Sequence, residues 1–154
     1  MSNEVFEKVE ARAELILSRQ IESYRAIQNR AGLLLGTLTI FISFYPSLIK
    51  DFDCQFRNLG IASFIVSSIS IVITLFVVRH KKLDEGLGEH RFEHLLNEKY
   101  DSYMTESISA LKTSIETNDK KLKKINRQFN RGLYTFIFAL LLGVTTIILN
   151  YLRL

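Results

Sequence analysis

The chain has 154 residues, of which 47% are hydrophobic and 23% are charged, and its formal net charge is +4. The apolar residues are concentrated in three uncharged stretches, so little is left from which a separate soluble domain could build its own core. We therefore expect one structural unit, comprising residues 1–154, whose core is formed by those stretches.

Residues 1–30 are expected to form a cytoplasmic amphipathic helix. They carry five acids and five bases and no apolar region of the signal-peptide kind, so cleavage is not expected. Asn3 is a suitable N-cap, and neither glycine nor proline occurs before Gly32. The apolar face has a spacing of three to four residues with one polar member: Val9, Ala13, Ile16, Gln20 and Ile27.

Three stretches are long enough to cross a membrane: residues 31–49, 58–78 and 132–152. A helix of about 20 apolar residues spans the ~30 Å hydrocarbon core of a bilayer. Buried helices of a soluble bundle would keep one polar face, whereas these stretches keep charge off every face. The sequence therefore predicts an all-α integral membrane protein with three transmembrane helices, joined by an outer loop (50–57) and a cytoplasmic helical bundle (79–131).

The distribution of Lys and Arg predicts the orientation. Residues 1–30 hold five of them, the 50–57 loop two and the 79–131 segment twelve. By the positive-inside rule the N-terminus and the 79–131 segment lie in the cytoplasm, and the C-terminus lies outside. The lone cysteine, Cys54, falls in the outer loop and cannot form an intramolecular disulfide.

The 79–131 segment contains the strongest periodic pattern outside the spans. Gly86 and Gly88 are expected to break the helix or form an elbow before a short helix over residues 89–99. A second helix is expected to start at Asp101 or Ser102 and to run into the third span. Its apolar residues form a heptad seam with one polar member, which we expect to pack within or between subunits: Met104, Ile108, Leu111, Ile115, Asn118, Leu122, Ile125 and Phe129. This helix should run parallel to the N-terminal helix. A polar layer of Gln20 and Asn118 that sets the register is a hypothesis.

Each span also carries one seam of small or hydroxyl residues, at a spacing of four, three and four: Gly32, Gly36, Thr39 and Ser43; Ser63, Ser67, Ser70 and Thr74; Ala139, Gly143, Thr146 and Asn150. Such seams let helices approach closely in a membrane, which suffices for the first and third. The second consists of hydroxyls throughout, and it either packs against another helix or lines an aqueous pore. No span contains a charge, which argues against proton relays, antiporters and voltage sensors.

A basic cluster lies at the predicted cytoplasmic membrane face: Arg79, Lys81, Lys82, Lys120, Lys121, Lys123, Lys124 and Arg127. One interpretation is that these charges set the membrane topology and attract anionic lipid headgroups. The other is a site for a nucleotide or oligonucleotide, held by its phosphates.

Enzymatic chemistry finds little support in the sequence. The run from His90 to His94 matches the H-x-x-E-H pattern of inverted zinc proteases, but only a heptad helix and a span follow it. We interpret these histidines as a solvated face or a subunit contact. No catalytic residue, metal or cofactor is predicted.

The order of these segments resembles the SLATT family and related small membrane effectors of bacterial anti-phage defence. A charged amphipathic helix, ELILSRQIESYRAIQNR (residues 14–30), enters a span punctuated by glycine, and a short outer loop, a Ser/Ile-rich span and a long charged cytoplasmic helix follow. The resemblance covers residues 10–130, and the third span departs from the two-span pattern of that family. It implies a pore-forming effector of the bacterial inner membrane, triggered by a nucleotide signal from a nucleotidyltransferase-type sensor.

From the residues we expect a homo-oligomer, with a tetramer favoured. The resemblance implies that it conducts ions and depolarises the cell in abortive infection when a nucleotide or nucleic acid binds. The alternative is a non-conducting membrane scaffold that docks a partner protein through residues 79–131.

Overall fold

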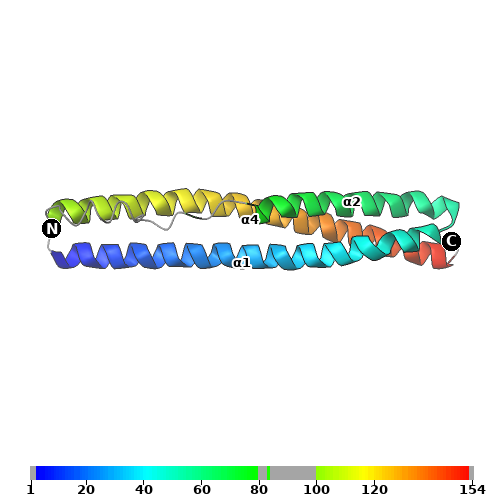
Figure 1. Ribbon diagram of the computed structural model, residues 1–154, viewed down its shortest axis with the longest axis horizontal. Helices are drawn as coiled ribbons and strands as arrows, with labels where there is room; N and C mark the ends of the chain where they lie inside the picture. The colour runs from blue at the N-terminus through cyan, green and yellow to red at the C-terminus, as the bar shows by residue number, and fades with distance from the viewer. Residues whose placement is uncertain (1–2, 80–82, 84–99, 153–154) are drawn as a thin grey trace. The chain divides into compact units, whose positions relative to one another are not determined.

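The computed structural model describes residues 3–79, Leu83 and residues 100–152, and almost all of them are helical. Three helices make up this part of the chain: α1 (Asn3–Lys50), α2 (Cys54–Val78) and α4 (Tyr100–Leu152) (Figure 1). Each is long and apolar enough to cross a membrane. The prediction of an all-α protein with three candidate membrane spans is confirmed.

The chain divides into two compact units. Unit 1 comprises residues 1–26 and 81–124, and unit 2 comprises residues 27–80 and 125–154. Helices α1 and α4 contribute to both units, while α2 belongs to unit 2 alone. The charged parts of α1 and α4 therefore share one core, and the three apolar stretches share another.

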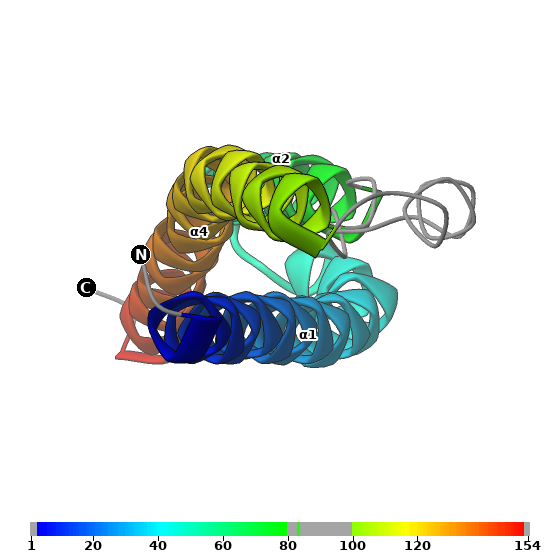
Figure 2. The same cartoon turned by 90° about the vertical axis from the view of Figure 1, so that its left-hand side faces the viewer.

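In unit 1 the helices α1 and α4 run side by side in the same direction, as the sequence predicted (Figures 1 and 2). The Ser107 hydroxyl donates a hydrogen bond to the Glu10 carboxylate at 2.7 Å. Further along both helices, the Gln20 side-chain amide donates to the backbone carbonyl of Ile115 at 3.1 Å. Residue numbers rise together along the two helices, so the helices are parallel.

The buried residues of α4 in unit 1 lie along a line that is rotated about the helix axis from the predicted heptad seam. Met104, Leu111 and Asn118 are buried as expected, but Ile108 and Ile115 are only half-buried. Between them the helix instead buries two residues that the sequence analysis left out, Ser107 and Ser114. Small side chains at these positions let α1 approach α4 closely, and the bond to Glu10 satisfies the Ser107 hydroxyl.

On α1 the buried residue facing α4 is Leu17, which is 5% exposed. The apolar face predicted for this helix is displaced to the edge of the contact, where Val9 and Ile16 remain 42% and 40% exposed. Helices α1 and α4 thus share a narrow core in unit 1, and the apolar surface beside this core is exposed.

Unit 2 buries small and hydroxyl side chains together with large apolar ones such as Leu38 and Phe136, and its outer surface is also apolar. Its interior contains Ala31, Leu38, Ala139 and four hydroxyl residues of α2, all without exposed surface: Ser63, Ser67, Ser70 and Thr74. The outer surface presents large apolar residues that are 40–74% exposed, among them Leu33, Ile40, Phe44, Ile65, Phe76, Phe138 and Leu141. A soluble bundle buries such side chains, whereas lipid solvates them, so this distribution is typical of a membrane-embedded bundle.

The turn between α1 and α2 is shorter than the predicted outer loop, because α2 begins at Cys54. Its N-cap is Asp53, whose carbonyl accepts bonds from the amides of Phe56 and Arg57 at 2.9 and 3.0 Å. The Phe52 ring folds back over Gly60, where a Cβ atom would lie 2.9 Å from the ring. Only glycine accommodates the ring at this distance, so Gly60 permits the tight turn.

Candidate functional site

The hydroxyl seam of α2 faces the interior of unit 2. Ser63, Ser67, Ser70 and Thr74 have no exposed surface. The Ser63 and Ser70 hydroxyls donate across the helix contact to the carbonyls of Ala139 and Gly132 in α4, at 2.8 and 2.7 Å. Ser67 and Thr74 donate to carbonyls one turn back in α2, at 2.9 and 2.8 Å. The sequence predicted that these four residues either pack against a helix or line a pore. In this structure they form a helix contact, and pore lining stays a prediction.

The small-residue seam of α4 forms the other side of that contact. A Cβ atom at Gly143 would lie 3.0 Å from the Ser63 hydroxyl and 3.1 Å from the Tyr45 hydroxyl. At Gly132 it would lie 2.7 Å from the Thr74 hydroxyl. Glycine at these two positions lets α2 and α4 approach to the distance at which the serine hydroxyls reach the facing carbonyls.

The seam of α1 has no such partner within unit 2. Gly32, Gly36, Thr39 and Ser43 are exposed, and a Cβ atom at either glycine would meet nothing within 4 Å. The Thr39 and Ser43 hydroxyls bond to carbonyls of their own helix at 2.9 and 2.8 Å. One of the three predicted packing seams is therefore unused by the described chain.

Tyr45 brings a polar group into the same interior. It is 2% exposed, and its ring stacks on Phe41 with a centroid distance of 4.7 Å. Its hydroxyl has no hydrogen-bond partner among the described residues. A buried hydroxyl without a partner costs about 1–3 kcal/mol, so the ring, and not the hydroxyl, accounts for the stabilising contact.

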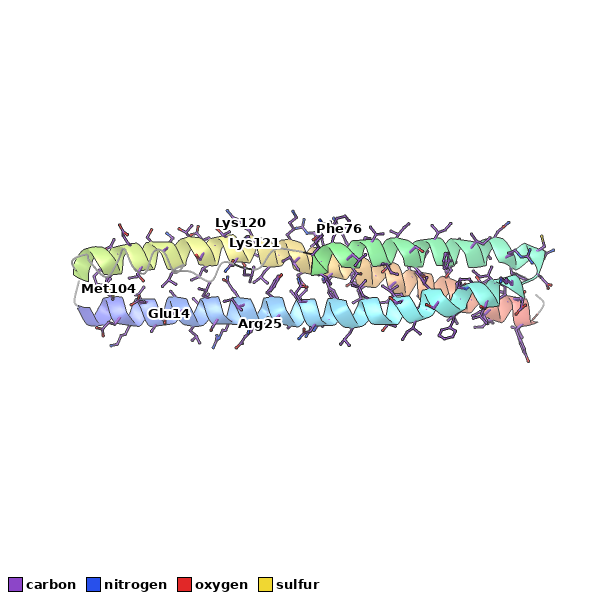
Figure 3. The ribbon with its side chains drawn as sticks, viewed as in Figure 1. Glu14, Arg25, Phe76, Met104, Lys120 and Lys121 are labelled. Carbon is purple, nitrogen blue, oxygen red and sulfur yellow. The ribbon has the colours of Figure 1, made fainter. Side chains whose placement is uncertain are left out.

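The basic cluster is partly described. Lys120 and Lys124 lie one turn apart in the unit 1 part of α4, and both are exposed; Figure 3 labels Lys120. Lys121 is half-buried, whereas Lys123 forms an ion pair with Asp119 at 2.7 Å. Among the described residues of this stretch, the exposed lysines outside an ion pair are Lys120 and Lys124.

The other members of the basic cluster are divided. Arg127 and Arg79 are exposed residues of unit 2. Lys81 and Lys82 lie outside the described residues, as do Gly86, Gly88, the expected helix over residues 89–99, and the histidines His90 and His94. The structure therefore gives positions to six of the eight predicted ligand-binding residues.

Gln20 and Asn118, the two residues of the hypothetical polar layer, lie at a similar level of the unit 1 contact. Asn118 has no exposed surface, and Gln20 bonds to the Ile115 carbonyl less than one turn away along α4. The Gln20 side-chain oxygen is buried without a partner among the described residues. Gln20 is thus bonded to the backbone of α4, and a role for the polar layer in setting the register stays a prediction.

An apolar groove runs along unit 1 between α1 and α4, and the sequence analysis did not predict it. Its volume is about 390 Å³, and its apolar lining consists of Val9, Ala13, Ile16, Ile108 and Ile115. The sequence shows apolar residues on both sides of Ser107 and Ser114. Serine usually indicates an exposed position on a helix, so the close helix contact at these serines and the groove beside it were not predicted.

The comparisons with known proteins give no relative. No protein-family model, curated protein or solved structure matches the chain significantly. The fold and the residues above therefore carry the functional argument alone.

Proposed function

We propose that this chain is a membrane effector of bacterial anti-phage defence that assembles as a homo-oligomer in the inner membrane and depolarises the cell. The observation that carries the proposal is the unused seam of α1 in unit 2. Gly32 and Gly36 present open backbone to the surroundings, while the seams of the other two helices are consumed in packing against each other. Small residues at such spacing drive helix association in membranes, and an identical chain is the partner always available.

The exposed face of α1 also supports a conducting assembly. Thr39 and Ser43 place hydroxyls on this outward face, with Thr37 beside them, whereas the hydroxyls of α2 point into the unit. If several copies meet through α1, hydroxyls from each copy would lie near the symmetry axis. A polar axis inside an apolar exterior is the arrangement that a pore requires.

Gating is proposed to act through Lys120 and Lys124. Both are exposed and unpaired among the described residues, and they lie in the same helix as the third span. Phosphate groups of a nucleotide or oligonucleotide would bind these lysines through charge-assisted hydrogen bonds. A ligand that binds one state of the assembly more tightly than another would shift its population toward that state.

The experiment that tests gating compares two double variants in infected bacteria that carry the chain and its genomic neighbours. Lys120→Glu/Lys124→Glu should reduce infection-triggered depolarisation at least tenfold, as read with a voltage-sensitive dye. Asp119→Ser/Lys123→Ser is the matched control: it alters two charges on the same turns but removes an existing ion pair, and it should leave the response within twofold of wild type. An unchanged response in the Lys120→Glu/Lys124→Glu variant, with wild-type protein levels in the membrane, would refute the ligand site.

A further inference from the structure

The apolar groove of unit 1 exposes surface that its own two helices do not cover. Val9 and Ile16 on the α1 side are 42% and 40% exposed, and Ile108 and Ile115 on the α4 side are half-buried. Unit 1 carries many charges and has no uncharged stretch of membrane-spanning length, so this groove faces water rather than lipid. Covering it would remove apolar surface from water at about 25 cal/mol per Å².

Charged residues edge the groove. Arg12 stands on the α1 side, and Lys112 and Glu116 stand on the α4 side. None of the three has an ion-pair partner in the part of the chain that the structure describes. The occupant that fits is therefore an apolar side chain accompanied by charge, with an acid opposite Lys112.

The chain carries such a combination on another face of α1. Leu15 is 51% exposed and precedes Ile16, so it points about 100° round the helix from the groove wall. Glu14 is exposed beside it (Figure 3). Leu15 is thus an apolar knob outside the groove of its own copy, with a carboxylate next to it.

Leu15 and the middle of the groove lie at the same level along the helix axes of unit 1. Glu10 lies beside Ser107 and Gln20 beside Ile115, so Leu15 stands midway between these two levels. The same levels bound the middle of the groove, where Lys112 lies. Copies inserted in one membrane share an orientation, so a residue of one copy meets residues of similar height in its neighbour. Leu15 meets this requirement, because it lies at the level of the groove.

We propose that the groove of one copy receives Leu15 of a second copy, with Glu14 of that copy against Lys112. Because knob and groove lie on different faces, the contact is heterologous and repeats from copy to copy until a ring closes. The interface rests on the homo-oligomer of the proposed function and names the surface that joins its unit 1 parts.

Disulfide cross-linking in isolated membranes tests this contact. In a Cys54→Ser background, one tagged copy carries Leu15→Cys and a differently tagged copy carries Ile108→Cys, and copper phenanthroline oxidises the membranes. The expected result is a dimer containing both tags, several-fold stronger than with Ser109→Cys, an exposed neighbour outside the groove. Neither cysteine variant expressed alone should give a comparable band.

Charge reversal provides the second measurement. Glu14→Lys should weaken the mixed cross-link several-fold, and Lys112→Glu in the partner copy should restore it. A cross-link that is indifferent to both changes would overturn the charged part of the contact.

Three results of the cross-linking would overturn the proposal. Homodimers from Ile108→Cys alone would show that two grooves face each other. An intramolecular bridge from Ile108→Cys to a cysteine placed at Leu95 would assign the groove to the chain's own 84–99 segment. Absence of any mixed dimer would leave the groove to a partner protein or to no occupant. Because the readout does not depend on membrane potential, cross-links without depolarisation would refute the proposed function and keep the interface.

Discussion

The Ser63 hydroxyl donates to the backbone carbonyl of Ala139 at 2.8 Å, and neither residue has exposed surface. Two turns along α2, Ser70 makes the equivalent bond to Gly132 in α4 at 2.7 Å. These two bonds tie α2 to α4 in the interior of unit 2. The polar seam of α2 therefore takes part in the contact between α2 and α4 within unit 2.

Enlarging these serines should destabilise the subunit rather than block a pore selectively. Ser63→Leu and Ser70→Leu would each force a larger side chain into a filled contact and break a bond, at a cost of about 1–3 kcal/mol from overpacking. We expect lower melting temperatures for the purified protein in detergent. Ser68→Leu is the control, since Ser68 is half-buried and bonds only within its own helix. Wild-type melting of the two variants with loss of conduction would instead support the pore-lining interpretation.

Gly132 at the α2–α4 contact and Gly36 in the open seam of α1 should respond differently to substitution by alanine. Gly132→Ala would place a Cβ 2.7 Å from the branched Thr74 side chain and should lower the melting temperature. Gly36→Ala meets nothing within 4 Å and gains helix propensity, up to about 1 kcal/mol. Its subunit stability should be unchanged or higher. Equal melting temperatures for the two variants would show that α2 and α4 are not in contact at Gly132.

The same face of α1 should matter for assembly. A leucine at Gly36 would separate helices that meet there, so Gly36→Leu should shift the oligomer toward smaller species in native mass spectrometry or light scattering in detergent. Leu33→Ala, one turn away on the apolar surface, is the control. An unchanged oligomer in Gly36→Leu would contradict assembly through the α1 seam.

Tyr45→Phe should not destabilise unit 2. The ring stacked on Phe41 is retained, and a buried hydroxyl without a partner among the described residues is removed. An unpaired buried hydroxyl costs about 1–3 kcal/mol, so the melting temperature should stay constant or rise. Ser63→Ala, which removes a bonded hydroxyl, should lower it. A fall for Tyr45→Phe would reveal a partner for the hydroxyl.

Two neighbouring leucines in unit 1 should separate folding from assembly. Leu17 is 5% exposed and packs in the core, so Leu17→Ala should cost about 2–5 kcal/mol of stability. Leu15 is 51% exposed, so Leu15→Ala should leave the melting temperature nearly unchanged while weakening contacts between copies. Similar melting curves and similar oligomers for the two variants would contradict this division.

The spans and the parallel pairing could be predicted because each rests on a long, repeated signal. A run of about 20 uncharged residues has few alternatives in a folded protein. The heptad pattern of α4 likewise predicted a helix contact, and Met104, Leu111 and Asn118 are buried in it.

The details that decide function could not be read from that pattern. Hydropathy places serine on surfaces, yet Ser107 and Ser114 are buried because α1 approaches closely there. Because the contact between α1 and α4 is rotated toward these serines, Ile108 lies at its edge, and the groove forms beside Ile108. Equally, three similar small-residue seams gave no indication of which two would pair, since that depends on how the helices are arranged in space.

The most direct test of the account is the membrane potential of bacteria that express the wild-type chain with its genomic neighbours, followed with a voltage-sensitive dye before and during phage infection. The account predicts a steady potential before infection and depolarisation soon after it, absent from cells that lack the chain. A steady potential throughout infection, with the protein shown to be in the membrane, would contradict a depolarising effector and leave a non-conducting scaffold.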